Sequence, residues 1–288
     1  MSQRGLFVGL TTLDWLYLAD APPDRNQKIV ALDYAMAAGG PATNAAVTFG
    51  HLGNTAILLT SLGQHPISPL IQSDLQTWGV DWIDLTPDRL EPLPTSSIIV
   101  TQATGERSVI SINAVKSQAP AHIIPADILQ GVEIVLIDGH QMIVSEEIAS
   151  RAQAMKIPIV VDGGSWKPGF ERVLPYADYV IGSANFHPPG CQTLEDTFSY
   201  LQGLEIPHIA ITQGDRPIQF VSRGQTGEIP VPKIQAIDTL GAGDVFHGAF
   251  CHFIGRSNFA TALAESAIVA ARSCRSFGTR AWMKSESG

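Results

Sequence analysis

Cysteine and positive charge are scarce in this sequence. Its 288 residues include three cysteines, Cys191, Cys251 and Cys274, and no C-x-x-C pair. An odd and sparse set argues against a disulfide-stapled secreted domain and favours a reducing compartment. Lysine and arginine total 18 against 27 acidic residues and form no cluster, so the formal net charge is −9. A nucleic-acid partner is therefore not expected, because such binding depends on clustered cations that neutralise phosphates.

Long apolar runs and linkers are also missing. No stretch approaches the roughly 18 apolar residues of a membrane span. Asp14 interrupts the apolar N-terminal stretch and no small-residue cleavage site follows, so this stretch predicts a first strand rather than a signal peptide. We therefore expect a cytoplasmic protein with no membrane partner. No repeat or low-complexity tract divides the chain, which predicts one domain over residues 1–288.

Short apolar strings alternate with helix-like stretches. A strand that is covered by helices on both faces has a continuous apolar sequence. Such runs, alternating with helix-like stretches, predict an α/β fold. The expected architecture is a doubly wound, mostly parallel sheet with helices on both faces. The predicted strands are Leu6–Gly9, Ala56–Leu59, Ile134–Ile137, Ile157–Val161, Tyr179–Ile181 and His208–Ile211. The predicted helices are Pro41–Leu52, Pro69–Trp78, Ser145–Met155, Thr193–Leu201 and two within Asp244–Ser273, separated at Gly255–Asn258.

Two strand-like segments break this alternation, because neither is followed by a helix of its own. They are Gln27–Met36 and Thr95–Asn113, the second with a turn at residues 103–106. They predict a small β lid over one edge of the main sheet, inserted at approximately 15–38 and 94–113. The alternative is a plain antiparallel extension of the sheet. A homodimer through the β lid is the oligomer that we consider.

The most specific motif is Asp238-Thr-Leu-Gly-Ala-Gly-Asp244, directly before an amphipathic stretch. Gly241 and Gly243 allow consecutive N–H groups to converge, and the helix behind them adds its positive dipole end. Such an anion hole suits the charge on a transferring phosphoryl group, with Asp244 at its mouth. The alternative is an ordinary turn followed by a favourable first-turn acid. Two acids around a Thr-x-Gly-x-Gly string at a helix start are rare, which favours a functional site.

A second candidate site lies at Gly39-Gly40-Pro41-Ala42-Thr43-Asn44. The glycines let backbone approach a ligand, Pro41 suits a first helical turn, and Asn44 offers both a donor and an acceptor. A polyhydroxylated ligand needs such groups. A strand-to-helix turn with a surface asparagine is the alternative.

Together the two motifs resemble the ribokinase-like, or pfkB-type, carbohydrate kinases, which include ketohexokinases and adenosine kinases. The matches follow the family's order from Gly9 to Gly278. The resemblance implies an ATP-dependent kinase that phosphorylates a hydroxyl of a sugar or sugar-like small molecule, with Mg²⁺. It also suggests a monovalent cation, K⁺, at carbonyls near Asp238 and Ser276–Gly278. Ser183 and Gly39-Gly40-Pro41 favour the ketohexokinase-like branch and a ketohexose-type acceptor over a nucleoside.

The resemblance also implies a role for each matching residue. The catalytic set is Asp244, the base that faces the acceptor hydroxyl, with the anion hole of Gly241, Ala242 and Gly243. The sugar-binding set is Asp14, matching an acid at the end of the first strand, with Gly39, Gly40, Asn44 and Asp244. The nucleotide-binding set is Ser183, Asn185, Thr212 and Gly214, with Gly241 and Gly243.

The sequence departs from the family pattern at the metal–phosphate motif. The expected Asn-x-x-Glu is not intact in Gly182–His187, so the Mg²⁺ ligands are left unassigned. The family's glycine motif after the second strand is replaced by Gly63–Ser68, and Ile218 stands where the nucleotide turn usually has a later glycine. A nucleoside kinase and a non-catalytic, kinase-like sugar or nucleotide sensor remain open. Dinucleotide and P-loop fingerprints are absent, which disfavours an oxidoreductase or a P-loop kinase.

Two further residues have a functional and an ordinary interpretation. His247 and Cys251 are spaced i, i+4, as zinc ligands on one helix face are, but no further ligand is suggested. We expect His247 to pack or hydrogen-bond near the site. Arg107, on the proposed lid, can reach a phosphate or sugar oxygen, or it is an exposed hairpin arginine.

Overall fold

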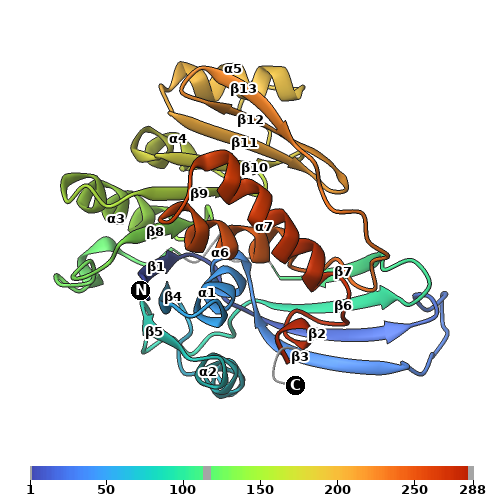
Figure 1. The fold of residues 1–288 in the computed structure, drawn as a ribbon. Coiled ribbons are helices and arrows are strands. Elements are labelled where there is room, and N and C mark those ends of the chain that lie inside the picture. Colours follow the sequence, from blue (N-terminus) through green and yellow to red (C-terminus); the bar gives the residue numbers. More distant parts are fainter. Residues whose placement is uncertain (1, 113–117, 285–288) are drawn as a thin grey trace.

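The computed structural model describes residues 2–112 and 118–284, which form two sheets (Figure 1). Within these residues the larger sheet has nine strands in the order β13-β12-β11-β10-β9-β8-β1-β4-β5. Its bounds are β1 (Arg4–Val8), β4 (Thr55–Thr60), β5 (Val80–Asp84), β8 (Ile134–Ile137), β9 (Ile159–Gly163), β10 (Tyr179–Ser183), β11 (His208–Gln213), β12 (Arg216–Ser222) and β13 (Gln225–Ile229). Strands from β5 to β11 run parallel, whereas β12 and β13 pair antiparallel at one edge.

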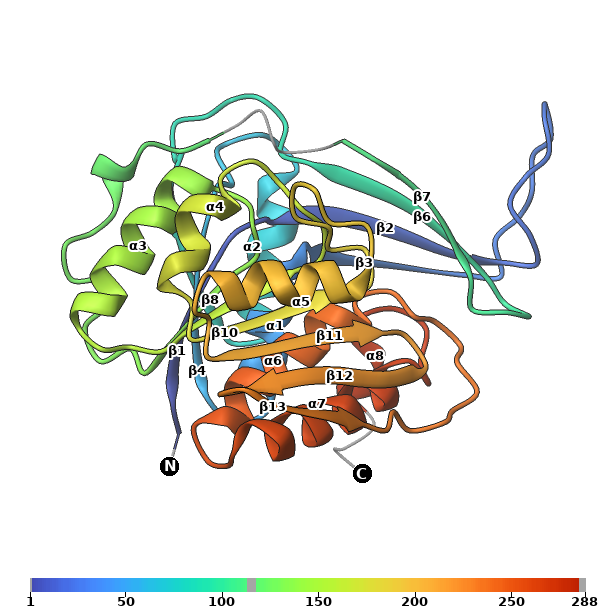
Figure 2. The ribbon, with the colours of Figure 1, turned by 90° about the horizontal axis from the view of Figure 1, so that it is seen from above.

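Helices cover both faces of the larger sheet (Figures 1 and 2). One face carries α1 (Pro41–His51), α2 (Ser68–Thr77), α6 (Ala242–Ile254), α7 (Phe259–Ser273) and α8 (Ala281–Lys284). The other face carries α3 (Met142–Ala154), α4 (Phe170–Val173) and α5 (Leu194–Gly203). Successive strand side chains point to opposite faces, so Leu136 of β8 packs with the first group and Val135 and Ile137 with the second. The predicted doubly wound, mostly parallel sheet is confirmed.

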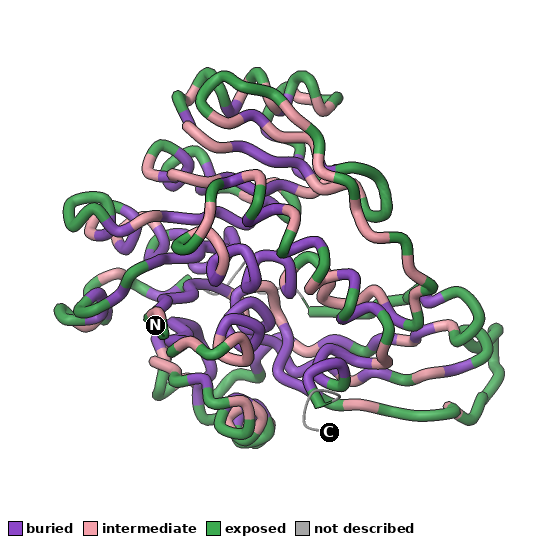
Figure 3. Tube along the Cα trace, in the orientation of Figure 1, coloured by how far each residue is buried: buried purple, intermediate pink, exposed green. Residues whose placement is uncertain are grey.

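The strands and helices predicted for the larger sheet are all present, with ends displaced by a few residues. The strands β5, β12 and β13 were not predicted. Each lies at or next to an edge of the sheet, where one side faces solvent and polar residues break the apolar pattern. Figure 3 shows the same contrast, with the buried residues concentrated along the central strands. No helix within residues 2–112 and 118–284 is long and apolar enough to span a membrane.

The smaller sheet, called the lid sheet below, extends to one side of the larger one (Figures 1 and 2). Its strands are β2 (Thr12–Ala19), β3 (Asp33–Gly39), β6 (Thr95–Thr101) and β7 (Arg107–Ser111), in the order β3-β2-β6-β7. The predicted turn joins β6 to β7, and Gly105 adopts a φ of +67° there. Asn113, the predicted end of this segment, lies outside the described residues.

Two predictions for the lid sheet were wrong in detail. The strand predicted at Gln27–Met36 begins only at Asp33, because its partner β2 ends at Ala19 and the residues before Leu32 find no strand to pair with. Asp14 was expected at the end of the first strand, but it lies inside β2, paired with Ala37. The strand β2 itself was not predicted, because its string Thr-Leu-Asp-Trp-Leu-Tyr-Leu-Ala follows β1 with hardly a break.

A close approach of two helices fixes the geometry from which the site is built. The face of α1 toward the core is lined by small residues, and Gly248 of α6 lies against its backbone. A Cβ added to Gly248 would lie 2.3 Å from the carbonyl oxygen of Ala45, far inside contact distance. A glycine at this position therefore sets how closely α1 and α6 can pack.

We predict that Gly248→Ala destabilises the protein by about 1–3 kcal/mol, because the two helices must separate to admit a methyl group. Gly203→Ala in α5 is the matched control, since a Cβ there would meet nothing within 4 Å. Its stability should stay unchanged or rise by up to about 1 kcal/mol. Urea unfolding of the two variants measures the difference, and equal stabilities would contradict the packing account.

Candidate active site

Asn44 and Asp244 meet where α1 and α6 approach each other. The Nδ2 of Asn44 donates a hydrogen bond to Oδ2 of Asp244 over 2.8 Å. Both residues lie near the starts of their helices, where Asp244 is one turn before Gly248 and Asn44 directly precedes Ala45. The two motifs predicted from the sequence, 200 residues apart, are thus joined by a direct hydrogen bond.

Arg280, which directly precedes α8, supports this pair from within the core. Its guanidinium donates from Nη1 to Oδ1 of Asn44 at 2.9 Å and from Nη2 to the carbonyl of Ala38 at 2.6 Å. It also forms an ion pair with Asp74 at 3.3 Å. Because Arg280 occupies Oδ1 of Asn44, the amide must present Nδ2 to Asp244. Sequence analysis missed Arg280, which belongs to no recognisable motif.

Asp14 lies on β2 with its carboxylate against the end of β3. The hydroxyl of Thr12 donates to Oδ1 of Asp14 over 2.7 Å. A Cβ on Gly39 would lie 1.9 Å from the other carboxylate oxygen, so only glycine fits beside Asp14. Gly40 has a φ of +97° and lies against the carbonyl of Leu10. Burial raises the pKa of Asp14, and hydrogen bonds from Thr12 and Ser96 and the charge of Arg280 oppose that rise.

The start of α6 is an open, positively polarised helix end. Gly241 adopts a φ of +71° as the N-cap and makes no side-chain cap. The N–H of Ala242 donates to the carbonyl of Thr239 at 3.3 Å, and the following first-turn N–H groups have no side-chain partner. Gly243 is exposed, and a Cβ there would meet nothing within 4 Å. With Ala242 between them, these residues make up the helix start that the motif predicts as an anion hole, and it is called the cradle below.

The loop before α6 is held by the carboxylate of Asp238. Its Oδ1 accepts from the N–H of Leu240 and its Oδ2 from the N–H of Gly278, each over 2.9 Å. From the lid sheet, Nη1 of Arg107 donates to the hydroxyl of Thr239 at 2.9 Å. Arg107 is an exposed hairpin arginine, as one of the two interpretations predicted, and this hydrogen bond ties it to the loop of residues 238–241, called the signature loop below.

The carboxyl group of Asp244 beside the cradle has a strongly raised pKa. Burial raises the pKa of Asp244 to about 7, and the nearby Asp162 carboxylate adds to the rise. The hydrogen bond from Asn44 and the proximity of His247 act in the opposite direction. A carboxylate with a pKa near neutrality, at a helix N-terminus that attracts anions, can accept a proton from a bound hydroxyl.

His247 links α6 to the larger sheet below the cradle. Its Nδ1 lies 2.7 Å from the carbonyl of Gly243 and its Nε2 lies 3.1 Å from the carbonyl of Ile181. Asp162, at the end of β9, lies 3.6 Å from Nδ1, and burial raises the pKa of that carboxyl while His247 lowers it. Among residues 2–112 and 118–284, no group of three or more histidines, cysteines or acids is arranged to hold a metal.

Asp138 is a second carboxylate that sequence analysis missed. Its Oδ2 accepts from the N–H of Leu10 at 2.8 Å and of Ala42 at 3.0 Å, which ties the β1–β2 turn to the start of α1. Its Oδ1 accepts from the N–H and Nδ1 of His140 at 2.9 and 3.1 Å. Burial alone would raise the pKa of Asp138, but His140 and these hydrogen bonds hold it below its ordinary value.

Position in the fold is the signal that could have identified Asp138 and Asp162. Asp138 directly follows the predicted strand Ile134–Ile137, and Asp162 directly follows Ile157–Val161. Ligands of open α/β sheets bind outside the carboxyl ends of the strands. An acid in that position deserves to be treated as a candidate even without a motif.

The predicted nucleotide-binding residues lie at the carboxyl ends of β10 and β11. Ser183 and Thr212 are direct neighbours in the strand register. The Ser183 hydroxyl donates to the carbonyl of Gly164 at 2.7 Å and accepts from the N–H of Asn185 at 3.1 Å. Gly214 is exposed with a φ of +69°. Within the described residues no hydrogen bond joins this group to Asp244, and His247 provides the connection from α6 to β10.

An uncapped helix start next to a carboxyl group with a raised pKa, at the carboxyl edge of a parallel sheet, is an arrangement that suits phosphoryl transfer. The model of the pfkB family of carbohydrate kinases matches residues 4–285. The chain belongs to this family, which confirms the predicted resemblance and with it the class of sugar-type kinases.

Known relatives agree with this assignment. The ribokinase of Bacillus subtilis is 24% identical over 248 residues, which are 84% of this chain and 83% of that protein. The ribokinase of Arabidopsis thaliana, solved with ribose and ATP, superposes with a TM-score of 0.78 at 18% sequence identity. The match covers 99% of this chain and 98% of the Arabidopsis chain. An E. coli neighbour solved with ATP and Mg²⁺ has a TM-score of 0.80 at 16% identity, covering 97% of this chain and 94% of its own.

Proposed function

We propose that this chain transfers the γ-phosphoryl group of ATP to a hydroxyl of a sugar or sugar-like alcohol, with Asp244 as the base. The observation that carries the proposal is Asp244 itself, with a pKa of about 7, held by Asn44 in the first turn of an uncapped helix. A protein that only sensed a sugar or nucleotide would have no need of such a group. The carboxylate therefore favours turnover.

The proposed roles follow from position. Asp244 orients the acceptor hydroxyl and takes its proton late, as the loose transition state forms, since an alcohol is far less acidic than a carboxyl group. The N–H groups of Gly241 and Gly243, on either side of Ala242, stabilise charge on the transferring group. Asp14 and Asn44 present carboxylate and amide groups to the acceptor. Gly39 and Gly40, which have no side chains, let the backbone at the end of β3 lie close to these two residues. Ser183, Asn185, Thr212 and Gly214 border the nucleotide.

The residues present fit a magnesium ion that is held mostly by nucleotide phosphates and water. Mg²⁺ commonly uses only one or two protein carboxylates and keeps several waters. The expected motif glutamate is absent, and Phe186 of that segment is instead 1% exposed in the core. Asp162, at the end of β9 beside His247, is the carboxylate that we assign to the hydrated ion. The ion would neutralise phosphate charge that the acidic side chains cannot.

We propose that the lid sheet covers the acceptor. The side chains of Leu16, Ile98 and Val100 form a small apolar cluster against Leu240 and Phe277, so one face of the lid sheet rests on the signature loop. Asp14 shares that face with Leu16, two residues on along β2. Closing this sheet over the sugar would exclude water from the transfer.

We predict that Asp244→Asn lowers kcat by about 10²–10⁴-fold, the usual contribution of a general base. Asparagine keeps the size and the position in the helix but removes the proton acceptor. Nucleotide affinity should change only a few-fold, because the lost interaction matures in the transition state. An ADP-release assay with Mg-ATP against ketoses, aldoses, sugar acids, sugar phosphates and nucleosides measures both. A kcat within about tenfold of the original protein would place the base elsewhere.

The same assay supplies its own controls. Gly243→Val should reduce turnover with little change in melting temperature, because its side chain would enter the open cradle and touch no neighbour. Excess EDTA should abolish activity. If a monovalent cation binds near Asp238, replacing sodium or tetramethylammonium by potassium should raise activity.

The same assay also tests the class of acceptor. Turnover of nucleosides alone would replace the sugar in the proposal by a nucleoside.

We propose further that two chains pair through the outer face of the lid sheet. Large apolar side chains on that face are exposed to solvent. Tyr34 of β3 is 68% exposed and Ile110 of β7 is 79% exposed. Exposed apolar patches of this kind mark interaction surfaces. We expect sedimentation at twice the chain mass for the original protein and at the chain mass for Ile110→Asp. A monomeric original protein would remove the dimer.

A further inference from the structure

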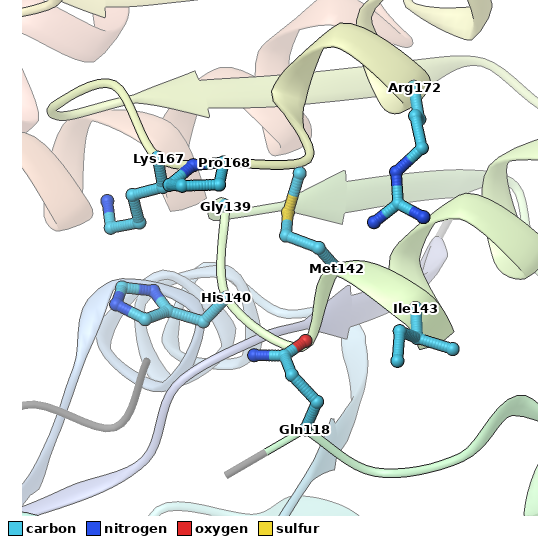
Figure 4. A pocket seen from close by; sticks show the side chains of 8 residues that line it. All are labelled: Gln118, Gly139, His140, Met142, Ile143, Lys167, Pro168 and Arg172. Carbon is cyan, nitrogen blue, oxygen red and sulfur yellow. The ribbon is translucent and has the colours of Figure 1, made fainter. Parts of the chain in front are cut away.

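A pocket with a volume of about 240 Å³ lies beside the proposed acceptor site, at the carboxyl ends of β8 and β9 (Figure 4). Basic and neutral side chains line it, among them His140, Lys167 and Arg172, and no acidic side chain of the described residues does so. In a chain with a net charge of −9, a lining of this kind is unusual. It points to a ligand with negative charge.

Lys167 gives the pocket a charge that no ion pair within the described residues neutralises. Its Nζ hydrogen-bonds only to the carbonyl and hydroxyl oxygens of Ser165, at 3.2 and 3.3 Å, and lies 5.9 Å from the ring centre of Phe170. Arg172 differs, because its Nη1 is paired with the Glu146 carboxylate at 3.0 Å. Lys167 is therefore the principal cation available to a ligand.

His140 adds a nearly buried polar group to the same side of the pocket. It is 9% exposed, and Asp138 holds its Nδ1, so the ring is fixed with Nε2 unpaired within the described residues. In Figure 4 the His140 ring and the Lys167 side chain extend in the same direction, away from Arg172. Both residues belong to the lining of the same pocket.

The start of α3 reinforces this preference for an anion. The helix begins at Met142, which lines the pocket, and it has no side-chain cap and no acid in its first turn. Its free N–H groups and dipole favour negative charge at this end. The helix end and the side chains are independent features that favour the same kind of ligand.

The pocket is coupled to the proposed base by short paths. Asp138 binds both His140 and the N–H of Ala42, two residues before Asn44. Asn44 in turn donates to Asp244, so hydrogen bonds and the first turn of α1 connect this side of the pocket to the proposed base.

We propose that this pocket binds an anionic group, a carboxylate or a phosphate, of the alcohol that is phosphorylated, with Lys167 and His140 as its ligands. The inference rests on the proposed kinase function and narrows its substrate to sugar acids or sugar phosphates. The acceptor site itself contains the carboxyl groups of Asp14 and Asp244, so the ammonium group of Lys167 and the ring of His140 are what favours an anionic substrate. Arg172 stays at the outer rim with Glu146.

Matched acceptors test this directly. The ADP-release assay compares fructose with fructose 6-phosphate and glucose with gluconate, for the original protein, Lys167→Met and the control Lys156→Met. Lys156 is exposed just after the opposite end of α3. We expect one anionic acceptor to exceed its neutral counterpart at least tenfold in kcat/KM. Lys167→Met should lower kcat/KM for that acceptor about 10- to 100-fold, the usual effect of losing a charged hydrogen bond, and leave the neutral one within about threefold.

Binding of inorganic phosphate separates this inference from the kinase proposal. At constant ionic strength, phosphate should raise the Tm of the original protein and of Lys156→Met more than that of Lys167→Met, since any phosphate at the α6 cradle is common to all three. If the protein prefers neutral acceptors to anionic ones, and Lys167→Met leaves kcat/KM unchanged, the inference about the pocket is wrong. The kinase proposal would not be affected by that result. A lysine-dependent phosphate effect without ADP release for any acceptor would overturn both the kinase and the assignment of the pocket to its substrate.

Discussion

The hydrogen bond between Asn44 and Asp244 is the interaction on which the site depends. It joins the first turn of α1 to the first turn of α6 and so fixes the proposed acceptor side against the proposed phosphate side. Two features hold it in place. Gly248 lets the helices approach, and Arg280 orients the asparagine amide from the opposite side. Because Arg280 also binds Asp74 and the carbonyl of Ala38, the same cation secures α2 and β3 to the pair.

The pKa of each acidic residue around the site depends on the groups that surround its carboxyl group. Asp138 is satisfied by backbone N–H groups and His140, which keeps its pKa low in spite of burial. Asp244 has one hydrogen-bond donor and a neighbouring acid, so burial prevails and its pKa rises. The pKa values of Asp138, which follows β8, and of Asp244, in the first turn of α6, are thus shifted in opposite directions by their partners. The first serves as a fixed anchor and the second suits proton transfer.

Features that depend on neighbouring residues in the chain could be predicted from the sequence, whereas features that depend on contacts between distant residues could not. The central strands, the helices and both glycine motifs follow from short patterns, and their positions agree with the structure. The strand β2 and the start of β3 were missed because pairing partners, not composition, determine where these strands begin and end. Arg280 and Asp138 were missed because their importance lies in contacts with residues far away in the chain, such as Asn44 and Leu10. No pattern within the neighbouring residues marks such contacts.

The most direct test of this account is the pH dependence of kcat with saturating Mg-ATP and acceptor, from about pH 5 to pH 9. Asp244 must be deprotonated to accept a proton, so kcat should be lost at low pH and rise to a plateau with a midpoint near the pKa of about 7. Asn44→Ala removes a donor that lowers this pKa, so the midpoint should move upward. A kcat that is flat across this range, or a midpoint that Asn44→Ala leaves in place, would contradict the central claim.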